Sequence, residues 1–168
     1  AIEGNRTSGT KFIKEAISKD VSAIVSTKKT KYKNDQIPLV LVKDIRKSLS
    51  EACSKFYKKK PTNIIAVTGT NGKTTIAWML RHLLINSGMK CGLLGTVVCD
   101  DGVKQEQSKL TTPSFCDTSR ILHAMVENGC ELAIMECSSH ALDQRRTCAL
   151  KFEIGVFTNL SGDHLDYH

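Results

Sequence analysis

The residues with the clearest chemical potential lie in the segment VTGTNGKTTIAWML, residues 67–80. An apolar run, Ile64–Val67, leads into two glycines, a lysine and two threonines, and a helical apolar pattern follows at once. Glycines let backbone N–H groups approach an anion closely, and the amino end of a helix adds partial positive charge. The ammonium of Lys73 would neutralise phosphate, and the hydroxyl of Thr74 could bind Mg²⁺. We therefore predict a nucleotide phosphate site here.

The spacing of this segment differs from the standard P-loop, G-x-x-x-x-G-K-[ST]. The first glycine of that pattern would stand at Val67, whereas Gly69 lies only three residues before Gly72. This departure disfavours a P-loop kinase or GTPase, and the lack of G-x-G-x-x-G disfavours a Rossmann dinucleotide site. The alternative is an ordinary strand-to-helix turn with Lys73 in water, which the K-T-T sequence at the helix start makes the weaker interpretation.

Polar residues also follow two other apolar runs. Glu136 comes directly after LAIM, and Asp163 and His164 come after IGVF and TNLSG. In parallel α/β sheets, chemistry gathers at the carboxyl ends of strands. A carboxylate at position 136 could hold Mg²⁺ opposite Thr74, or it could cap the next segment. His164 could ligate a metal, orient a phosphate or act as an acid or base, or it could be a structural hydrogen-bonding residue.

Two further segments could bind anions. LTTPS, residues 110–114, places hydroxyls at a helix start, with Thr112 as the expected N-cap and Pro113 at the first helical position. QRR, residues 144–146, could bind phosphate or carboxylate through a bidentate arginine. Spacing alone favours ordinary capping for the first segment and a solvated turn for the second.

The elements that must position these residues follow from periodicity and turn signals. Short apolar runs predict strands at 23–25, 39–42, 64–67, 91–95, 132–135 and 154–157, of which 39–42 and the last two are expected to be buried. Three helical patterns are predicted: one after Asp44, one after the glycine turn and one from Pro113. Asp44 is the expected N-cap of the first, Gly88 should end the second and Gly129 should end the third. Residues 99–109 predict a hairpin or loop. Strands that alternate with helices predict an α/β fold, with a parallel sheet covered on both faces.

Composition narrows the class of protein. Of 168 residues, 40% are apolar and 24% charged, and no apolar run approaches the roughly 20 residues of a membrane helix. The start has no apolar signal-peptide core and the end shows no cap, so we expect a fragment of a longer protein. Seven cysteines without C-x-x-C spacing favour reduced thiols, as in a cytoplasmic protein, over zinc or disulfides.

Charge divides the chain near Pro61. Residues 1–60 carry 15 Lys and Arg against 6 Asp and Glu, whereas residues 61–168 carry 9 against 11. This asymmetry predicts two units. The basic runs TKKTKYK and YKKKP could contact phosphates, although a solvated lysine-rich face and linker is the favoured interpretation. Only 5% of the residues are aromatic, which disfavours nucleic acid as a partner.

Together, TGTNGKTT (residues 68–75), TTP (111–113), MECSSHALDQRR (135–146) and FTNLSGDHLDYH (157–168) resemble the Mur ligases. Within that family they look most like the MurE type, which adds a diamino acid to UDP-N-acetylmuramoyl-L-alanyl-D-glutamate. GTNGKT alone is shared with folylpolyglutamate synthase, whereas SSHALDQRR and TNLSGDHLDYH are more specific. The start, AIEGNRTSG, also resembles the family's UDP-binding first domain.

The resemblance implies part of a small UDP-binding domain at 1–60 and the first half of an ATP-binding domain at 61–168. It implies an ATP-dependent ligase of peptidoglycan precursor synthesis, in which the D-glutamyl carboxylate is phosphorylated and the amine of the diamino acid attacks the acyl phosphate. The implied ATP-binding residues are Gly69, Thr70, Asn71, Gly72, Lys73, Thr74 and Thr75. The implied Mg²⁺ ligands are Thr74, Glu136 and His164; Lys73, Glu136 and His164 are the implied catalytic residues. The implied substrate contacts are Thr111, Thr112, Ser138, Gln144 and Arg146.

Some positions depart from the family pattern. Ser8-Gly9 stands where many first domains carry an acidic D-G pair, and Leu110 stands where Asn is common. The family's carbamylated lysine and third domain would lie beyond His168, so we expect this chain alone to bind nucleotide without turnover. We expect a cytoplasmic monomer, and the choice of diamino acid stays open. The rivals are another superfamily ligase, such as folylpolyglutamate synthase, and a non-catalytic nucleotide-binding module.

Overall fold

The chain divides into two compact units, Ala1–Leu49 and Ser50–His168. A computed structural model describes residues 1–2, 7–27 and 36–162. Helix α2 (Ile45–Phe56) crosses the boundary between the units. Asp44 caps this helix as expected, because its Oδ1 accepts hydrogen bonds from the N–H groups of Arg46 at 3.1 Å and Lys47 at 3.0 Å. The functional division near Pro61 stays a prediction.

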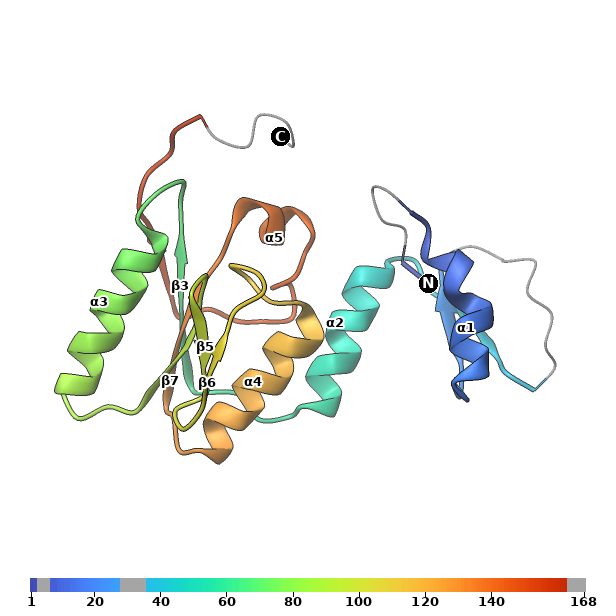
Figure 1. Ribbon diagram of the computed structural model, residues 1–168, viewed down its shortest axis with the longest axis horizontal. Coiled ribbons are helices and arrows are strands. Elements are labelled where there is room, and N and C mark those ends of the chain that lie inside the picture. Colours follow the sequence, from blue (N-terminus) through green and yellow to red (C-terminus); the bar gives the residue numbers. More distant parts are fainter. Residues whose placement is uncertain (3–6, 28–35, 163–168) are drawn as a thin grey trace. The chain divides into compact units, whose positions relative to one another are not determined.

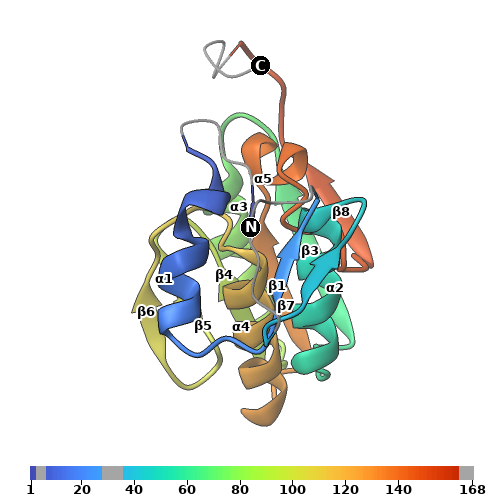
Figure 2. The ribbon, with the colours of Figure 1, turned by 90° about the vertical axis from the view of Figure 1, so that its right-hand side faces the viewer.

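The first unit holds two short parallel strands (Figure 2). Its elements are η1 (Gly9–Phe12, a 3-10 helix), α1 (Ile13–Ser18), β1 (Ile24–Ser26) and β2 (Leu39–Leu41). Ile24 is buried, whereas Val40 and Leu41 are 44% and 48% exposed. The expectation of a buried strand at 39–42 is therefore wrong: β2 lies in a sheet of two described strands, and its side chains are half-buried or exposed.

The second unit is built on a six-stranded sheet with the order β6-β5-β4-β7-β3-β8. The strands are β3 (Asn63–Thr68), β4 (Cys91–Leu94), β5 (Val98–Asp100), β6 (Gln105–Gln107), β7 (Leu132–Glu136) and β8 (Ile154–Phe157). β3, β4, β7 and β8 pair in parallel. β5 and β6 add an antiparallel hairpin beside β4. The α/β prediction is confirmed, with this hairpin as the antiparallel exception.

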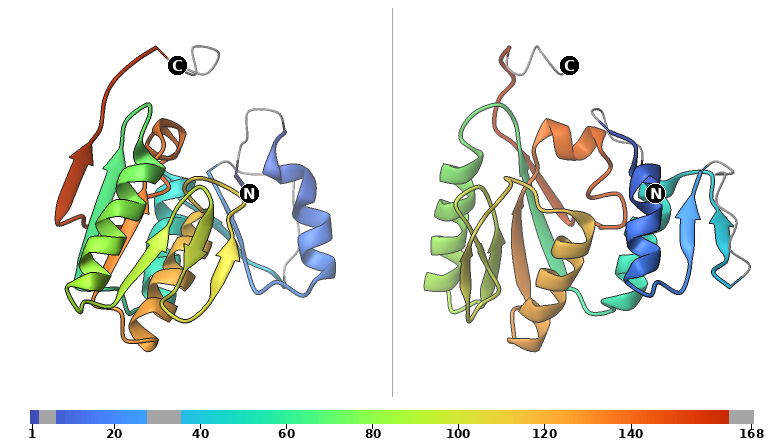
Figure 3. Two further views of the ribbon diagram at one scale, coloured as in Figure 1. Left: turned by 60° about the vertical axis from the view of Figure 1, so that its left-hand side comes forward. Right: turned by 45° about the vertical axis from the view of Figure 1, so that its right-hand side comes forward.

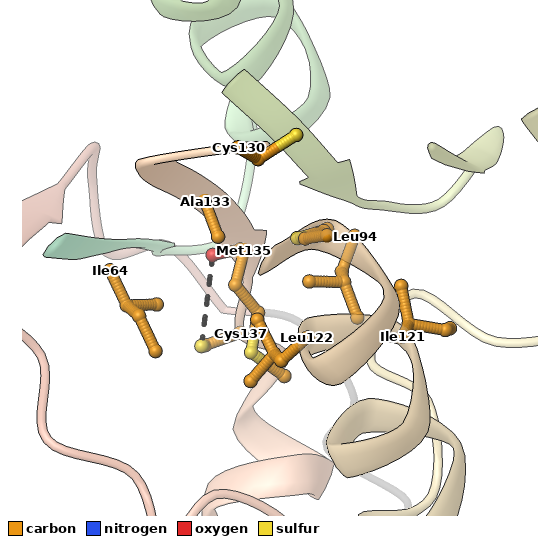
Figure 4. Close-up of a cluster of buried hydrophobic side chains, with 9 residues drawn as sticks. Ile64, Leu94, Ile121, Leu122, Cys130, Ala133, Met135 and Cys137 are labelled. Carbon is orange, nitrogen blue, oxygen red and sulfur yellow. Dashed lines mark hydrogen bonds between the residues drawn. The ribbon is translucent and has the colours of Figure 1, made fainter. Parts of the chain in front are cut away.

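Helices cover both faces of this sheet (Figure 1). They are α3 (Lys73–Asn86), α4 (Phe115–Glu127) and the short α5 (Ser139–Asp143). Ala77 of α3 packs with Leu93 on one face, and Leu122 of α4 packs with Leu94 on the other (Figure 4). Consecutive strand residues point to opposite faces, so β4 contributes to both clusters. Within the described residues, no helix combines the length and the apolar character that a membrane span requires.

The helix ends agree with the turn signals in part. Gly88 and Gly129 follow α3 and α4 as predicted, and both have a left-handed φ, +83° and +81°. The N-cap of α4 is Ser114, whose Oγ accepts a hydrogen bond from the N–H of Asp117 at 3.2 Å. Thr112 as the N-cap and Pro113 at the first helical position are therefore both wrong, because α4 begins at Phe115. Ser114 has an acidic partner three residues on, the usual capping spacing, and its hydroxyl donates back to Asp117 Oδ2 at 2.6 Å.

Strand β8 lies at the edge of the sheet and pairs only with β3 among the described strands (Figure 3). Its residues Ile154 and Phe157 are 52% and 64% exposed. The expectation of a buried strand at 154–157 is therefore wrong. An apolar run has the same sequence pattern in a central strand and in an edge strand, and only the strand order distinguishes them.

Candidate functional site

The sequence-predicted residues gather where parallel strands end. β3 lies between β7 and β8, and β7 lies between β3 and β4, all four running in the same direction. Their carboxyl ends therefore share one edge of the sheet. The segments that follow them carry the glycine loop, Thr96, the α5 segment and Thr158–Ser161.

The glycine loop joins β3 to α3 with two glycines in positive-φ conformations, Gly69 at +125° and Gly72 at +84°. Gly72 is the N-cap of α3 and has no side chain with which to cap the helix. Among the described residues, the first N–H groups of α3 have no side-chain acceptor, as at helix anion sites. The Nζ atom of Lys73 donates to the carbonyls of Gly69 at 2.7 Å and Thr70 at 2.9 Å, so its ammonium lies over the loop.

The segment after β8 forms hydrogen bonds with the glycine loop. The N–H groups of Thr70 and Asn71 donate to the carbonyl and the side-chain oxygen of Asn159, each at 3.0 Å. The Thr158 hydroxyl donates to the Asn71 carbonyl at 2.6 Å. Sequence reasoning did not single out Thr158 or Asn159. Their position directly after an apolar strand was a signal, but only the pairing of β8 with β3 places them against the loop.

Glu136, the last residue of β7, is fully buried among hydroxyl and amide donors. The Thr74 hydroxyl donates to Glu136 Oε2 at 2.8 Å. Thr96 donates its backbone N–H to Oε1 at 3.0 Å and its hydroxyl to Oε2 at 2.9 Å. The structure thus brings Thr74 and Glu136 together and adds Thr96. Sequence reasoning missed Thr96, although it comes just after an apolar strand and a glycine.

The donor set around Glu136 fits a hard cation such as Mg²⁺. The ion pairs found between described residues do not include Glu136, so its carboxylate lies buried beside neutral donors. A buried carboxylate without a counterion is costly. Mg²⁺ prefers a few carboxylate or hydroxyl oxygens and completes its shell with water and phosphate oxygens. The part of the chain that the structure describes holds no cluster of three or more His, Cys, Asp or Glu that could form an all-protein metal site.

Four of the predicted substrate residues form one hydrogen-bonded group. Thr112 is fully buried; its hydroxyl donates to the Glu136 carbonyl at 2.8 Å and accepts from the Ser138 N–H at 3.0 Å. Arg146 donates to the Thr112 carbonyl at 2.8 Å. Its Nε and second terminal nitrogen donate to Gln144 Oε1 at 3.1 and 2.7 Å. The hydroxyl of Thr112 is thus engaged inside the protein.

The other predicted residues are placed differently. The Oγ1 atoms of Thr111 and Thr96 lie 3.2 Å apart, which links Thr111 to the Glu136 group. Thr75 is exposed in the first turn of α3. His164 lies outside the described residues, so the structure says nothing of its role as a metal ligand.

A cavity of about 260 Å³ opens between the glycine loop, the end of β8 and the start of α5. The residues lining it are Thr68, Gly69, Thr70, Lys73, Ser138, Ser139, Leu142, Phe157, Leu160 and Ser161. Lys73 belongs to the predicted phosphate site and Ser138 to the predicted substrate group. The two predicted sites therefore share one cavity.

A family model matches this part of the chain. The model is the Mur ligase middle domain, and it covers residues 67–168, which hold the glycine loop and Glu136. The chain belongs to the Mur ligase family. The resemblance found in the sequence motifs is thereby confirmed.

Curated relatives of this Mur ligase chain are named UDP-N-acetylmuramoyl-L-alanyl-D-glutamate–2,6-diaminopimelate ligase. The one from Rickettsia montanensis is 39% identical over 172 residues, covering 100% of this chain and 36% of the relative. The one from Aquifex aeolicus is 41% identical over 170 residues, covering 100% of this chain and 35% of the relative. This Mur ligase chain thus spans about a third of the length of these relatives.

Solved structures agree with the family. A structure of a ligase with the same name has a TM-score of 0.78 and 29% identity, covering 94% of this chain and 32% of that one. The MurF ligase of Thermotoga maritima, solved in complex with ADP, has a TM-score of 0.62 and 21% identity, covering 99% and 35%. At that identity the second likeness supports the Mur ligase fold alone.

Proposed function

We propose that this Mur ligase chain is the nucleotide-binding part of a MurE-type enzyme, an ATP-dependent ligase that adds a diamino acid to UDP-N-acetylmuramoyl-L-alanyl-D-glutamate. About 40% identity to ligases of that name, over the whole chain, supports the substrate class over folylpolyglutamate synthase. The observation that carries the proposal is the 2.8 Å hydrogen bond from Thr74 to the buried Glu136. It joins the end of the glycine loop to a carboxylate on the central strand.

The proposed roles in nucleotide binding follow from this geometry. Gly69 to Thr75 surround the phosphates with N–H groups, and Lys73 exchanges its two carbonyl contacts for phosphate oxygens. Thr74 and Glu136 hold Mg²⁺, and His164 helps to hold a second ion. Bound Mg²⁺ supplies neutralisation of the phosphate charge and holds the phosphate oxygens in a fixed orientation.

The chemistry proposed for this site needs no protein nucleophile. A carboxylate is a poor electrophile because it lacks a leaving group. Transfer of the γ-phosphoryl group of ATP to the D-glutamyl carboxylate supplies one, and the amine of the diamino acid then displaces phosphate to form the amide. Such a transfer depends on positioning and charge neutralisation, which Lys73 and the amides of the glycine loop can supply. The cysteines therefore need no catalytic role.

The group around Thr112 is proposed to bind the UDP-muramoyl dipeptide. Gln144 and the Thr112 carbonyl hold the guanidinium of Arg146 in a fixed plane, and a substrate carboxylate would bind it in place of Gln144 Oε1 on the edge formed by Nε and one terminal nitrogen. Ser138 lines the cavity shared with Lys73. Thr111 is the remaining proposed substrate contact. Thr112 is buried, so its proposed role is to hold Ser138 and Arg146 in place for the substrate.

A lysine substitution tests the phosphate site. In the protein expressed from its complete reading frame, Lys73→Ala should abolish ATP binding measured by calorimetry, because it removes the ammonium over the loop. Lys151→Ala, which removes an exposed lysine side chain elsewhere in the same unit, is the matched control and should bind ATP normally. Undiminished ATP affinity in Lys73→Ala would refute the phosphate assignment.

The amino acid added is proposed to be 2,6-diaminopimelate, because the relatives carry that name. ATP and UDP-linked precursors are cytoplasmic, so we place the enzyme there, as a monomer. The test incubates the same protein with ATP, Mg²⁺, UDP-N-acetylmuramoyl-L-alanyl-D-glutamate and either diaminopimelate or L-lysine. Mass spectrometry should show the diaminopimelate adduct; a lysine adduct alone would contradict the choice of amino acid but leave the ligase intact.

A further inference from the structure

We propose that Thr96 is a positioning residue, which fixes the Glu136 carboxylate for Mg²⁺ and connects it to Thr111. This inference rests on the proposed function. Thr96 makes two contacts with the carboxylate, one from its N–H at 3.0 Å and one from its hydroxyl at 2.9 Å. The two contacts reach different oxygens, so Thr96 holds both the position and the rotation of the carboxylate group.

Gly95 gives the carboxylate the room that this arrangement needs. A Cβ atom at Gly95 would lie 2.4 Å from Glu136 Oε1, closer than any real contact of that kind. The carboxylate therefore lies directly against the backbone at the end of β4. The Gly95-Thr96 pair thus forms the third side of the site, beside the glycine loop after β3 and the end of β7.

The hydrogens of the threonine side chains give this network a direction. A hydroxyl has one hydrogen to donate and lone pairs to accept with. A carboxylate that holds Mg²⁺ is ionised and only accepts, so the Thr96 hydrogen goes to Glu136 Oε2. The same Thr96 hydroxyl has the donor geometry toward Thr111 Oγ1, 3.2 Å away, so Thr111 is an acceptor in this pair. Thr96 therefore shares one hydrogen between the ionised Glu136 carboxylate and Thr111, with the shorter contact to Glu136.

This direction restricts what Thr111 can offer to a substrate. Thr111 accepts from Thr96, so its own hydrogen is not used in that contact and can be donated to a ligand. The matching ligand group is an acceptor, such as a carbonyl or carboxylate oxygen of the UDP-muramoyl dipeptide.

The test compares ATP affinity with and without Mg²⁺, in the protein expressed from its complete reading frame. The dissociation constant without Mg²⁺ divided by the dissociation constant with Mg²⁺ measures how strongly Mg²⁺ promotes ATP binding. Thr96→Val keeps the shape and the N–H but removes the hydroxyl, and it should lower this ratio about 10- to 100-fold, the usual effect of losing a group that orients a metal ligand. Affinity for ATP without Mg²⁺ should not change. Thr96→Ser should restore the ratio.

A matched control separates positioning from general damage. Thr118 is a buried threonine of the same unit, away from Glu136, and its hydroxyl donates to the Pro113 carbonyl at 3.5 Å. Thr118→Val should keep the wild-type ratio. An unchanged ratio in Thr96→Val overturns the role of Thr96 while leaving the proposed function intact. A wild-type protein that binds no ATP overturns the proposed function itself, and this inference with it.

Discussion

Gly69→Ala tests whether the glycine loop and the segment after β8 form one packed unit. Gly69 has φ of +125°, and a Cβ atom there would lie 2.2 Å from Thr158 Oγ1. It would also lie 2.8 and 2.9 Å from the backbone O and N of Asn159. The Thr158 side chain could rotate away, but the Asn159 backbone can retreat only if the whole segment moves. That movement would break the hydrogen bond from the Thr70 N–H to the Asn159 carbonyl.

The size of the effect follows from these contacts. Backbone strain at a positive φ costs about 1–3 kcal/mol. Loss of one or two hydrogen bonds adds about 1 kcal/mol each. The more restricted unfolded chain of the alanine variant offsets about 0.4–1 kcal/mol. The free energy of unfolding should therefore fall by about 3 kcal/mol in Gly69→Ala, within limits of about 1 and 5 kcal/mol.

Gly72→Ala is the matched control within the same loop. Its φ of +84° is also left-handed, but a Cβ atom there would meet nothing within 4 Å. It should cost only the conformational term, about 1 kcal/mol. Urea unfolding, followed by circular dichroism and by the fluorescence of Trp78, gives both values. Equal losses in the two variants would refute the packing argument, because strain alone would then explain Gly69.

Two further predictions concern the rest of the second unit. Asp100→Asn should lower the free energy of unfolding by about 3 kcal/mol in urea, because it leaves the largely buried Arg81 guanidinium without its counterion; a loss below the experimental error would mean that Arg81 finds another partner. Burial raises the pKa of Cys53 and Cys137 to about 12 and that of Cys91 to about 11. At pH 8 their thiolate fractions are roughly 10⁻³ or less, and they should become reactive only as the pH rises toward those values. Iodoacetamide should therefore label the exposed Cys116 and Cys148 first, and peptide mapping that finds Cys137 among the earliest sites would contradict the burial.

The local pattern of the sequence was sufficient to predict most helices and strands, and to predict Thr74 and Glu136 as residues of the site. Apolar runs located the strands, and polar residues directly after them pointed to Thr74 and Glu136. These two residues are far apart in the chain, yet the rule that parallel strands end at one edge was enough to expect them together. The hydrogen bond between them agrees with that expectation.

What the sequence could not supply was the order of the strands. Thr96 reaches Glu136 because β4 is the neighbour of β7, and Asn159 reaches the glycine loop because β8 is the neighbour of β3. Neither adjacency follows from the spacing of residues along the chain. The same limit explains the exposed β8. At the start of α4, Thr112 was the expected N-cap, but Ser114 caps the helix, and the acidic Asp117 three positions after Ser114 is the signal that could have identified it.

The position of β8 has a consequence for the motions of the site. Among the described strands, β8 has β3 as its one neighbour, and such an exposed edge strand is among the first elements to open in local unfolding. The segment after β8 holds Thr70 and Asn71, so each opening would release the glycine loop, while Glu136 on the central β7 stayed fixed. The glycine loop, which is proposed to bind the phosphates, would thus fluctuate on a shorter timescale than Glu136. A bound nucleotide would hold the loop closed and, through it, slow the exchange of amide hydrogens along β8.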